Sequence, residues 1–268
     1  MMSGRNRFDK KRVLVTGGGT GIGRAIALAF ADEGARIVIA GRRPELLSSV
    51  AAEREQGVIL EHTCDIAVPE EARSLVAAAI AALGGLDVLV NNAGIGITKG
   101  VLEHTDEDWD SSLAINLSGA FHCSQAAARH MVESGGGSIV NVASICSFLA
   151  DSPHVAYNVS KAGMTMLTQC FAFELGHLGV RCNAVAPGLT LTEMVEPQMA
   201  DDIFRDHYLG RIPVRRVALP EEQAAVVLFL ASDDASFVNG ETIVADGGML
   251  KGAWWMPSEA PPVPPRPR

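Results

Sequence analysis

The sequence predicts a doubly wound α/β fold in which a seven-stranded parallel sheet carries helices on both faces. Short apolar, β-branched runs alternate along the chain with longer amphipathic stretches, which is the order of repeated strand–helix units. The runs are continuously apolar, as is typical of strands that are buried on both faces. No linker-like segment separates them, so we expect one domain.

Each element follows from its local pattern. The run RVLVT is the first strand, and the helix after it ends before Gly34, a residue type that favours helix C-termini. Pro44 opens the second helix, because proline is well tolerated in a first turn. The expected strands are residues 12–16, 36–40, 58–62, 86–90, 138–142, 181–185 and 242–244. The expected helices are residues 22–33, 44–56, 69–83, 106–131, 155–178 and 221–231.

Two segments depart from this rhythm. Residues 189–219 are long and mixed, and we expect a partly helical flap over the substrate. Its side chains Met194, Met199, Phe204 and Tyr208 give an adaptable and largely apolar lining, unless they merely pack the flap's helices onto the rest of the domain. Residues 257–268 are proline-rich, and we expect a disordered or extended tail. The predicted domain is therefore residues 1–256.

Composition excludes several classes of function. The formal net charge is −9, so the chain lacks the basic footprint of a nucleic-acid binder or of a protein that docks on anionic membranes. The five cysteines have no metal-ligand spacing, and we expect no metal. No apolar run approaches the roughly 20 residues of a membrane span, and the opening residues do not resemble a signal peptide. The default expectation is a cytoplasmic protein.

A glycine-rich segment follows the first strand and predicts a phosphate-binding loop. Glycines allow the backbone to turn sharply and to approach a pyrophosphate, while the next helix directs its N-terminal N–H groups at the negative charge. Glycine clusters also occur in ordinary loops, but here a strand precedes the segment and an amphipathic helix follows it. The expected cofactor-binding residues of this loop are Gly17, Thr20, Gly21, Ile22 and Gly23.

The end of the second strand indicates which dinucleotide is bound. An acidic residue there would bind the ribose 2′-hydroxyl of NAD, whereas arginine accommodates the 2′-phosphate of NADP. This chain has Gly41 followed by Arg42 and Arg43, which favours NADP(H) over NAD(H) unless both arginines are merely solvated loop charges. Asp65 and Ile66 follow the third strand, where we expect contact with the adenine.

Further motifs recur in a fixed order. They are Asn91–Gly94 after the fourth strand, Asn116, Ser144, Tyr157 with Lys161 four residues later, Pro187–Gly188, and Asp246–Gly248. Together with the glycine loop, they make residues 11–249 resemble the short-chain dehydrogenase/reductases. The resemblance implies a Rossmann fold, a nicotinamide cofactor, and a catalytic set of Asn116, Ser144, Tyr157 and Lys161.

Tyr157 and Lys161 also point to proton transfer on chemical grounds. A spacing of four places both side chains on one face of a helix. A phenol with a pKa near 10 is a poor base at neutral pH, and we expect the Lys161 ammonium and an oxidised nicotinamide ring to lower that value. Ser144 would bind the substrate oxygen and polarise the carbonyl. By resemblance, Asn116 anchors a water in the proton relay, and Lys161 holds the nicotinamide ribose.

The resemblance assigns the remaining contacts. Additional cofactor residues are Asn92, Ala93, Gly94, Pro187, Gly188, Thr190 and Thr192, besides Tyr157 and Lys161. The expected substrate residues are Ser144, His154, Tyr157 and Met194. His154 could equally be an ordinary packed or solvated histidine.

The sequence therefore predicts an NADP(H)-dependent oxidoreductase that transfers a hydride between nicotinamide and a small ketone or secondary alcohol. One alternative is a β-ketoacyl-carrier-protein reductase, although Phe173 and the run Gly135–Gly137 stand where those enzymes carry basic residues. Others are an NAD-dependent alcohol dehydrogenase of the same family, or a nucleotide-binding regulator without turnover. By resemblance, we expect a homotetramer or homodimer that pairs helices 106–131 and 155–178.

Overall fold

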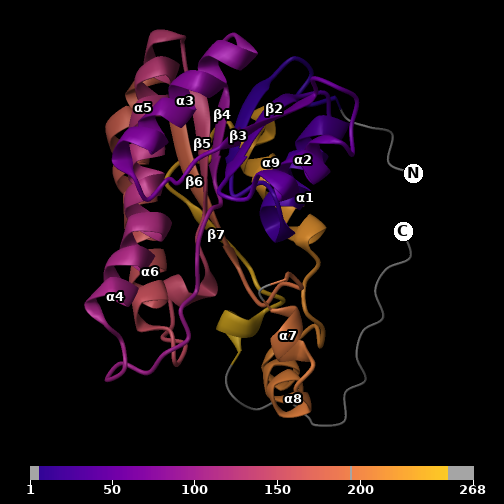
Figure 1. Ribbon diagram of the computed structural model, residues 1–268, viewed down its shortest axis with the longest axis vertical. Helices are drawn as coiled ribbons and strands as arrows, with labels where there is room; N and C mark the ends of the chain where they lie inside the picture. The colour runs from indigo at the N-terminus through magenta and orange to yellow at the C-terminus, as the bar shows by residue number, and fades with distance from the viewer. Residues whose placement is uncertain (1–5, 194, 253–268) are drawn as a thin grey trace.

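In the computed structural model, which describes residues 6–193 and 195–252, seven parallel strands form one sheet in the order β3-β2-β1-β4-β5-β6-β7 (Figure 1). The strands are β1 (Arg12–Thr16), β2 (Arg36–Gly41), β3 (Ile59–Thr63), β4 (Val88–Asn91), β5 (Gly137–Val142), β6 (Val180–Pro187) and β7 (Thr242–Ala245). All seven expected strands are present, and the predicted fold class is confirmed. The strand order reverses between β1 and β4, which is where doubly wound sheets bind ligands.

Helices cover both faces of this sheet. They are α1 (Gly21–Asp32), α2 (Pro44–Ala51), α3 (Pro69–Leu83), α4 (Asp106–Leu113), α5 (Gly119–Glu133), α6 (Val155–Leu175), α7 (Glu196–Met199), α8 (Asp202–Arg211) and α9 (Pro220–Ala231). Figure 1 shows α3, α5 and α6 on one face and α1, α2 and α9 on the other. Successive residues of β1 enter opposite cores: Val13 and Val15 pack in the core with α1 and α9, and Leu14 packs in the core with α3 and α5.

Two helices differ most from their predicted bounds. The second helix ends at Ala51 rather than near residue 56, because the backbone bonds of Glu53 and Arg54 span only three residues and the chain then turns at Gly57, which has φ +87°. The helix expected at residues 106–131 is divided by a π-helical turn, η1 (Ala114–Ser118), which separates α4 from α5. Such turns often occur at functional sites. This one contains Asn116.

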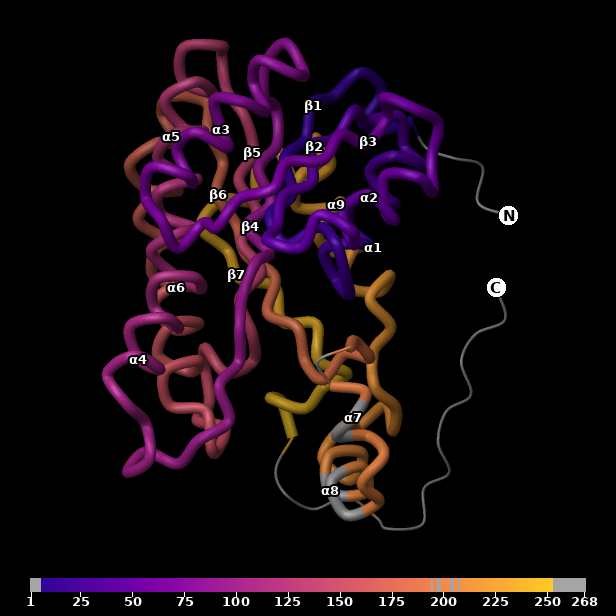
Figure 2. The backbone as a smooth tube through the Cα atoms, viewed as in Figure 1, coloured from indigo at the N-terminus to yellow at the C-terminus, as the bar shows by residue number. Residues whose placement is uncertain are grey.

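The flap forms α7 and α8 below the carboxyl ends of the strands (Figure 2). Its two ends are joined by backbone hydrogen bonds between Leu191 and Ala218, 2.8 Å, and between Ala218 and Leu189, 2.9 Å. Met194 and residues 257–268 lie outside the described residues, as does the side chain of Phe204. The limits of the domain, flap and tail therefore stay predictions. Among the described helices, none has the length and apolar character needed to cross a membrane.

Candidate functional site

The glycine-rich loop joins the end of β1 to the start of α1 and packs closely on the end of β4. Gly17 has φ +66°, and a Cβ placed on it would lie 2.8 Å from the Cα of Ala93. The Asn92 side chain donates hydrogen bonds to the backbone oxygens of Thr16, 3.1 Å, and Gly17, 3.0 Å. These contacts hold the loop in a conformation that only glycine adopts easily.

The start of α1 is open to an anion. A Cβ on Gly23 would approach the Gly17 oxygen to 2.1 Å, so the helix begins directly against the loop. Thr20 occupies the N-cap position, but its side chain makes no capping hydrogen bond. The first-turn N–H groups of α1 therefore have no side-chain cap, and helix N-termini of this kind stabilise phosphate groups. Ile22 is partly buried against the core, so its side chain packs α1 onto the sheet.

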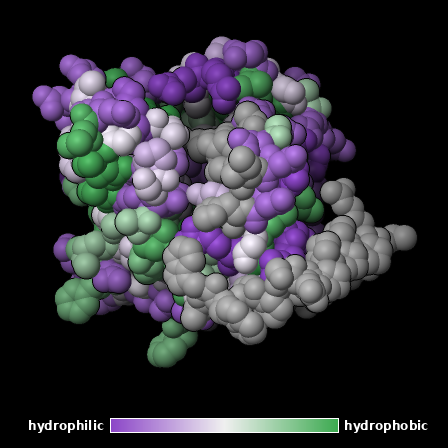
Figure 3. Space-filling view, turned by 90° about the horizontal axis from the view of Figure 1, so that it is seen from below, coloured by the Kyte–Doolittle hydropathy of each residue, from purple (hydrophilic) through white to green (hydrophobic). Residues whose placement is uncertain are grey.

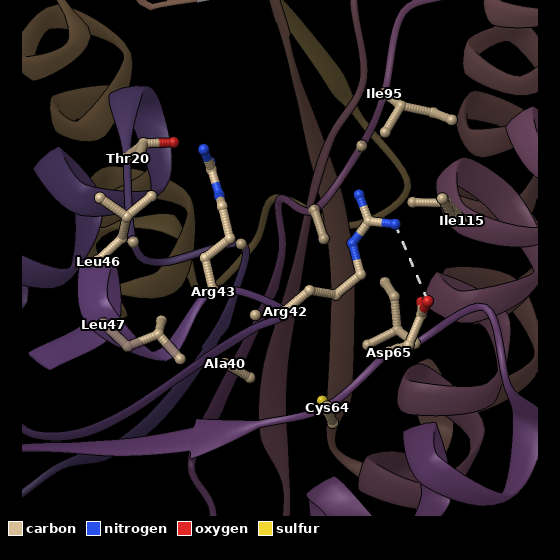
Figure 4. Close-up of a pocket in the computed structure, with 16 residues that line it drawn as sticks. Thr20, Ala40, Arg42, Arg43, Leu46, Leu47, Cys64, Asp65, Ile95 and Ile115 are labelled. Atoms are coloured by element: carbon tan, nitrogen blue, oxygen red, sulfur yellow. Dashed lines mark ion pairs between the residues drawn. The ribbon is translucent and has the colours of Figure 1, made fainter.

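A pocket extends from this loop across the ends of β2 and β3 (Figure 4). Arg42 and Arg43 both line it, and in Figure 4 Arg43 points toward Thr20 while Arg42 points toward Asp65. The Arg42–Asp65 ion pair is long, 3.9 Å, and the Arg42 side chain is 59% exposed. An exposed pair of this length contributes little stability, so the guanidinium remains available to an incoming anion.

The same pocket contains the other predicted residues of this region and several that the sequence analysis missed. Gly17, Thr20, Asp65, Ile66, Ala93 and Gly94 line it, as expected. The missed residues include Leu46 and Leu47 in the first turn of α2, and Ile115 in η1. The sequence could have indicated them only by their positions: the two leucines closely follow Arg42 and Arg43, and the isoleucine directly precedes Asn116. Branched aliphatic side chains at these positions give this part of the pocket an apolar surface for a cofactor ring.

Lys161 and Asn116 lie next to each other beyond this pocket. Lys161 is 4% exposed, and its Nζ donates to the carbonyl of Val142 at the end of β5, 2.7 Å. Asn116 is fully buried, and its side chain exchanges two hydrogen bonds with the backbone of Ile95, 2.8 and 2.9 Å, and donates to Ser160, 3.0 Å. A Cβ on Gly94 would lie 3.3 Å from Asn116 Oδ1 and 3.5 Å from Lys161 Nζ. The three predicted positions therefore converge.

Tyr157 lies on the preceding turn of the same helix. Lys161 Nζ is 5.6 Å from the centre of the Tyr157 ring, and the Ser144 side chain lies close enough to the phenol to lower its pKa. The Ser144 hydroxyl also accepts from the backbone N–H of Cys146, 3.1 Å, which fixes its direction. Four residues from three separate segments thus surround one point at the carboxyl edge of the sheet.

The electrostatics of this cluster differ from the sequence expectation. Burial raises the pKa of Tyr157 to about 12, against a lowering by the Ser144 hydrogen bond. Burial also lowers the pKa of Lys161 to about 8. Desolvation therefore outweighs the attraction between ammonium and tyrosinate in the protein alone, and the phenol holds its proton at neutral pH.

Gly188, Thr190 and Thr192 follow the end of β6, and one of them reaches the phosphate loop. Gly188 donates from its backbone to Ala245, 3.0 Å, at the turn after Pro187. Thr190 is 4% exposed, and its hydroxyl donates to Gly188 O, 3.0 Å, and accepts from Gln223, 3.3 Å. Thr192 lies against the phosphate loop, because a Cβ on Gly21 would be 3.1 Å from its methyl group. Thr192 is therefore better placed than Thr190 to contact a dinucleotide.

His154 contacts groups that the sequence analysis did not identify. Its Nε2 is 3.0 Å from Thr98 Oγ1, and its Nδ1 is 3.8 Å from Asp151 Oδ2. The ring centres of His154 and Tyr157 are 6.4 Å apart. The Tyr208 hydroxyl on α8 donates to Asp151, with 3.1 Å to each carboxylate oxygen. These residues come from separate segments, and no local pattern relates them.

Within residues 6–193 and 195–252, no three His, Cys, Asp or Glu side chains are placed to hold a metal ion.

Comparisons with known proteins agree with this geometry. Residues 17–250 match a family model described as enoyl-(acyl carrier protein) reductase. The chain is 41% identical to a D-threitol dehydrogenase of Mycolicibacterium smegmatis, over 90% of this chain and 94% of that protein. It is 38% identical to a 3-oxoacyl-[acyl-carrier-protein] reductase of Thermotoga maritima, over 91% and 99%.

A solved structure is similar over the whole fold. It is a gluconate 5-dehydrogenase from Burkholderia cenocepacia in complex with NADP and tartrate, with a TM-score of 0.88 and 34% identity. The similarity covers 93% of this chain and 99% of that one.

Proposed function

The chain belongs to the short-chain dehydrogenase/reductase family, an assignment that makes it an oxidoreductase of alcohol and carbonyl groups, and we propose that it works with NADP(H) and uses Tyr157 as its proton-transfer residue. The observation that carries this proposal is the convergence of Tyr157, Lys161, Ser144 and Asn116 at the sheet edge that also holds the glycine loop. A regulator without turnover would have no use for that convergence.

Each side chain has one chemical task in this proposal. The bound nicotinamide supplies the hydride acceptor for an alcohol, or the hydride donor for a carbonyl compound. Ser144 donates a hydrogen bond to the substrate oxygen and supports the charge that develops there. Tyr157 takes the hydroxyl proton during oxidation and returns it during reduction. Lys161 places a positive charge one helical turn away and binds ribose hydroxyls.

NADP(H) is favoured over NAD(H) by the chemistry at the end of β2. No carboxylate stands at Gly41, and two guanidinium groups line the pocket where a 2′-phosphate would lie. Planar guanidinium groups pair with phosphate oxygens through two parallel hydrogen bonds. The gluconate 5-dehydrogenase structure, which contains NADP, supports the same choice.

We propose that the chain forms a homodimer or homotetramer through the helices of residues 106–131, which are α4 and α5, and through α6. Val159, Met166 and Phe173 are spaced by seven residues on α6 and are 43%, 58% and 90% exposed. Trp109 on α4 is also exposed. Seen from below, hydrophobic residues gather along the left edge of the molecule, the side on which α4 and α6 lie in Figure 1 (Figure 3). Pairing with a second copy would bury this apolar stripe.

A carrier-protein-tethered substrate is the second candidate, because the chain is similar to a 3-oxoacyl-[acyl-carrier-protein] reductase. An acidic carrier needs basic residues at its docking surface, whereas position 173 presents an almost fully exposed phenylalanine and the net charge is −9. We therefore propose a free ketone, secondary alcohol or sugar.

The test is a panel of ketones, secondary alcohols and polyols, assayed with all four nicotinamide dinucleotides by the absorbance of the reduced ring. We expect turnover of at least one small substrate, with higher kcat/KM for NADP(H) than for NAD(H). If the protein binds NADPH but turns over no substrate in either direction, it is not the proposed enzyme.

A further inference from the structure

We propose that Asp151, oriented by Tyr208 and lying beside His154, recognises a hydroxyl group next to the reacting carbon, so that the preferred substrates are uncharged diols, polyols or sugars. This inference rests on the proposed function, since it assigns a substrate class to the same site. It adds a polar group to the predicted, largely apolar lining.

The position of Asp151 supports this role. The residue lies between Ser144 and Tyr157 in the chain, on the segment that leads into α6. Its carboxylate is 3.8 Å from His154 Nδ1, and the His154 ring faces Tyr157 edge-on at 6.4 Å. Its charge also contributes to the raised pKa of Tyr157 and Tyr208. Asp151 is therefore a neighbour of the phenol that we propose to exchange a proton with the substrate.

The carboxylate has unused capacity to accept hydrogen bonds. An ionised carboxylate offers about four lone-pair sites, and the Tyr208 hydroxyl supplies one proton, placed equally between both oxygens. Among the described residues, no lysine or arginine lies within ion-pair distance of Asp151. Its side chain keeps 27% of its surface exposed. A half-buried carboxylate without a strong cationic partner gains from each hydroxyl donor that approaches it.

The neighbouring groups hold Asp151 in place. The amide of Asn158 donates to the Asp151 backbone oxygen, 2.7 Å, and Tyr208 reaches it from α8. His154 is held by Thr98, 3.0 Å away. A carboxylate fixed in this way would bind a vicinal hydroxyl and repel an anionic substrate by like charge. When a monoalcohol is bound, the carboxylate has no substrate hydroxyl to accept a hydrogen bond from.

The experiment compares meso-2,3-butanediol with 2-butanol, which lacks the second hydroxyl. The kcat/KM ratio of diol to monoalcohol is measured for the wild type, Asp151→Asn and Tyr208→Phe with the preferred oxidised dinucleotide. The ratio cancels any change in Tyr157 that affects both substrates equally. We expect the wild type to prefer the diol, and Asp151→Asn to lower that preference about 10- to 100-fold, the loss of one charge-assisted hydrogen bond.

Tyr208→Phe tests the positioning role. It should lower the diol-to-monoalcohol ratio several-fold, through a higher KM for the diol rather than a lower kcat. Asp9→Asn is the matched control, because Asp9 is an exposed carboxylate beside the C-terminal end of α1 and should leave the ratio unchanged. Cofactor affinity and thermal unfolding verify that each variant is folded. If Asp151→Asn does not fold, Asp151→Ala is used in its place.

The outcomes separate this inference from the proposed function. If the wild type oxidises both alcohols but the ratio is the same in Asp151→Asn, the role of Asp151 is refuted and the oxidoreductase assignment stands. If the wild type turns over neither these alcohols nor the other substrates in the panel, the proposed function fails and this inference fails with it.

Discussion

Replacement of Lys161 by methionine should make the free energy of unfolding respond differently to pH. The Lys161 side chain is 4% exposed, and burial lowers its pKa from 10.5 to about 8. This drop corresponds to about 3 kcal/mol between the two protonation states, so at pH 7 the buried ammonium reduces the stability of the wild type by about that amount. Methionine has a similar length and carries no charge.

The sign follows from the two pKa values. Because Lys161 binds its proton less tightly in the folded protein than in the unfolded chain, unfolding takes up a proton between about pH 8 and pH 10.5. The penalty is complete below pH 8 and is lost as pH rises through this window. Between pH 7 and pH 9.5 the wild type should gain about 2 kcal/mol relative to Lys161→Met. The opposite effect of Tyr157, whose pKa is raised from 10 to about 12, begins only above this range.

Urea unfolding at pH 7, 8 and 9.5, at one protein concentration, measures this difference. Methionine also removes the hydrogen bond to the Val142 carbonyl, about 1 kcal/mol, but that loss is the same at each pH. Lys251→Met, at an exposed lysine, is the control and should show no pH-dependent difference from the wild type. A constant difference between the wild type and Lys161→Met across the three pH values would refute the burial of a charged amine at this position.

Three further predictions concern the cofactor, the substrate oxygen and assembly. Arg42→Asp should weaken NADPH binding at least about tenfold and leave NADH binding nearly unchanged, as measured by fluorescence titration; equal losses for both would contradict the 2′-phosphate assignment. Ser144→Ala should lower kcat about 100-fold with unchanged NADPH affinity, and a change in affinity alone would remove its role at the substrate oxygen. Phe173→Asp should shift the protein toward monomers in sedimentation experiments, because a charge would replace a 90% exposed aromatic ring in the proposed interface; an unchanged oligomer would place the interface elsewhere.

The sheet and the glycine loop could be predicted because their signals are local. Continuous β-branched runs identify buried strands, and the loop's glycines immediately follow one of them. The division of residues 106–131 by η1 could not be predicted, because it depends on contacts made outside the helix. One is the approach of Gly119 to Ile66, where a Cβ would lie 2.7 Å from the backbone oxygen.

The proximity of the four side chains could be predicted from the sequence, but their electrostatics could not. The spacing of Tyr157 and Lys161 places them together, yet it gives no information on burial, which reverses the expected direction of the pKa of Tyr157 in the protein alone. The contact between Asp151 and Tyr208 joins residues 57 positions apart and depends on how the flap folds back. Such contacts have no periodic signal in the sequence.

The central claim is that the phenol of Tyr157 transfers the substrate proton, and Tyr157→Phe tests it most directly. The variant keeps the ring and loses only the hydroxyl, so NADPH affinity measured by fluorescence should stay within about twofold of the wild type. Turnover of the best substrate should fall at least about 100-fold, the range for a lost general acid–base group. Wild-type turnover in a variant that still binds the cofactor would contradict the account.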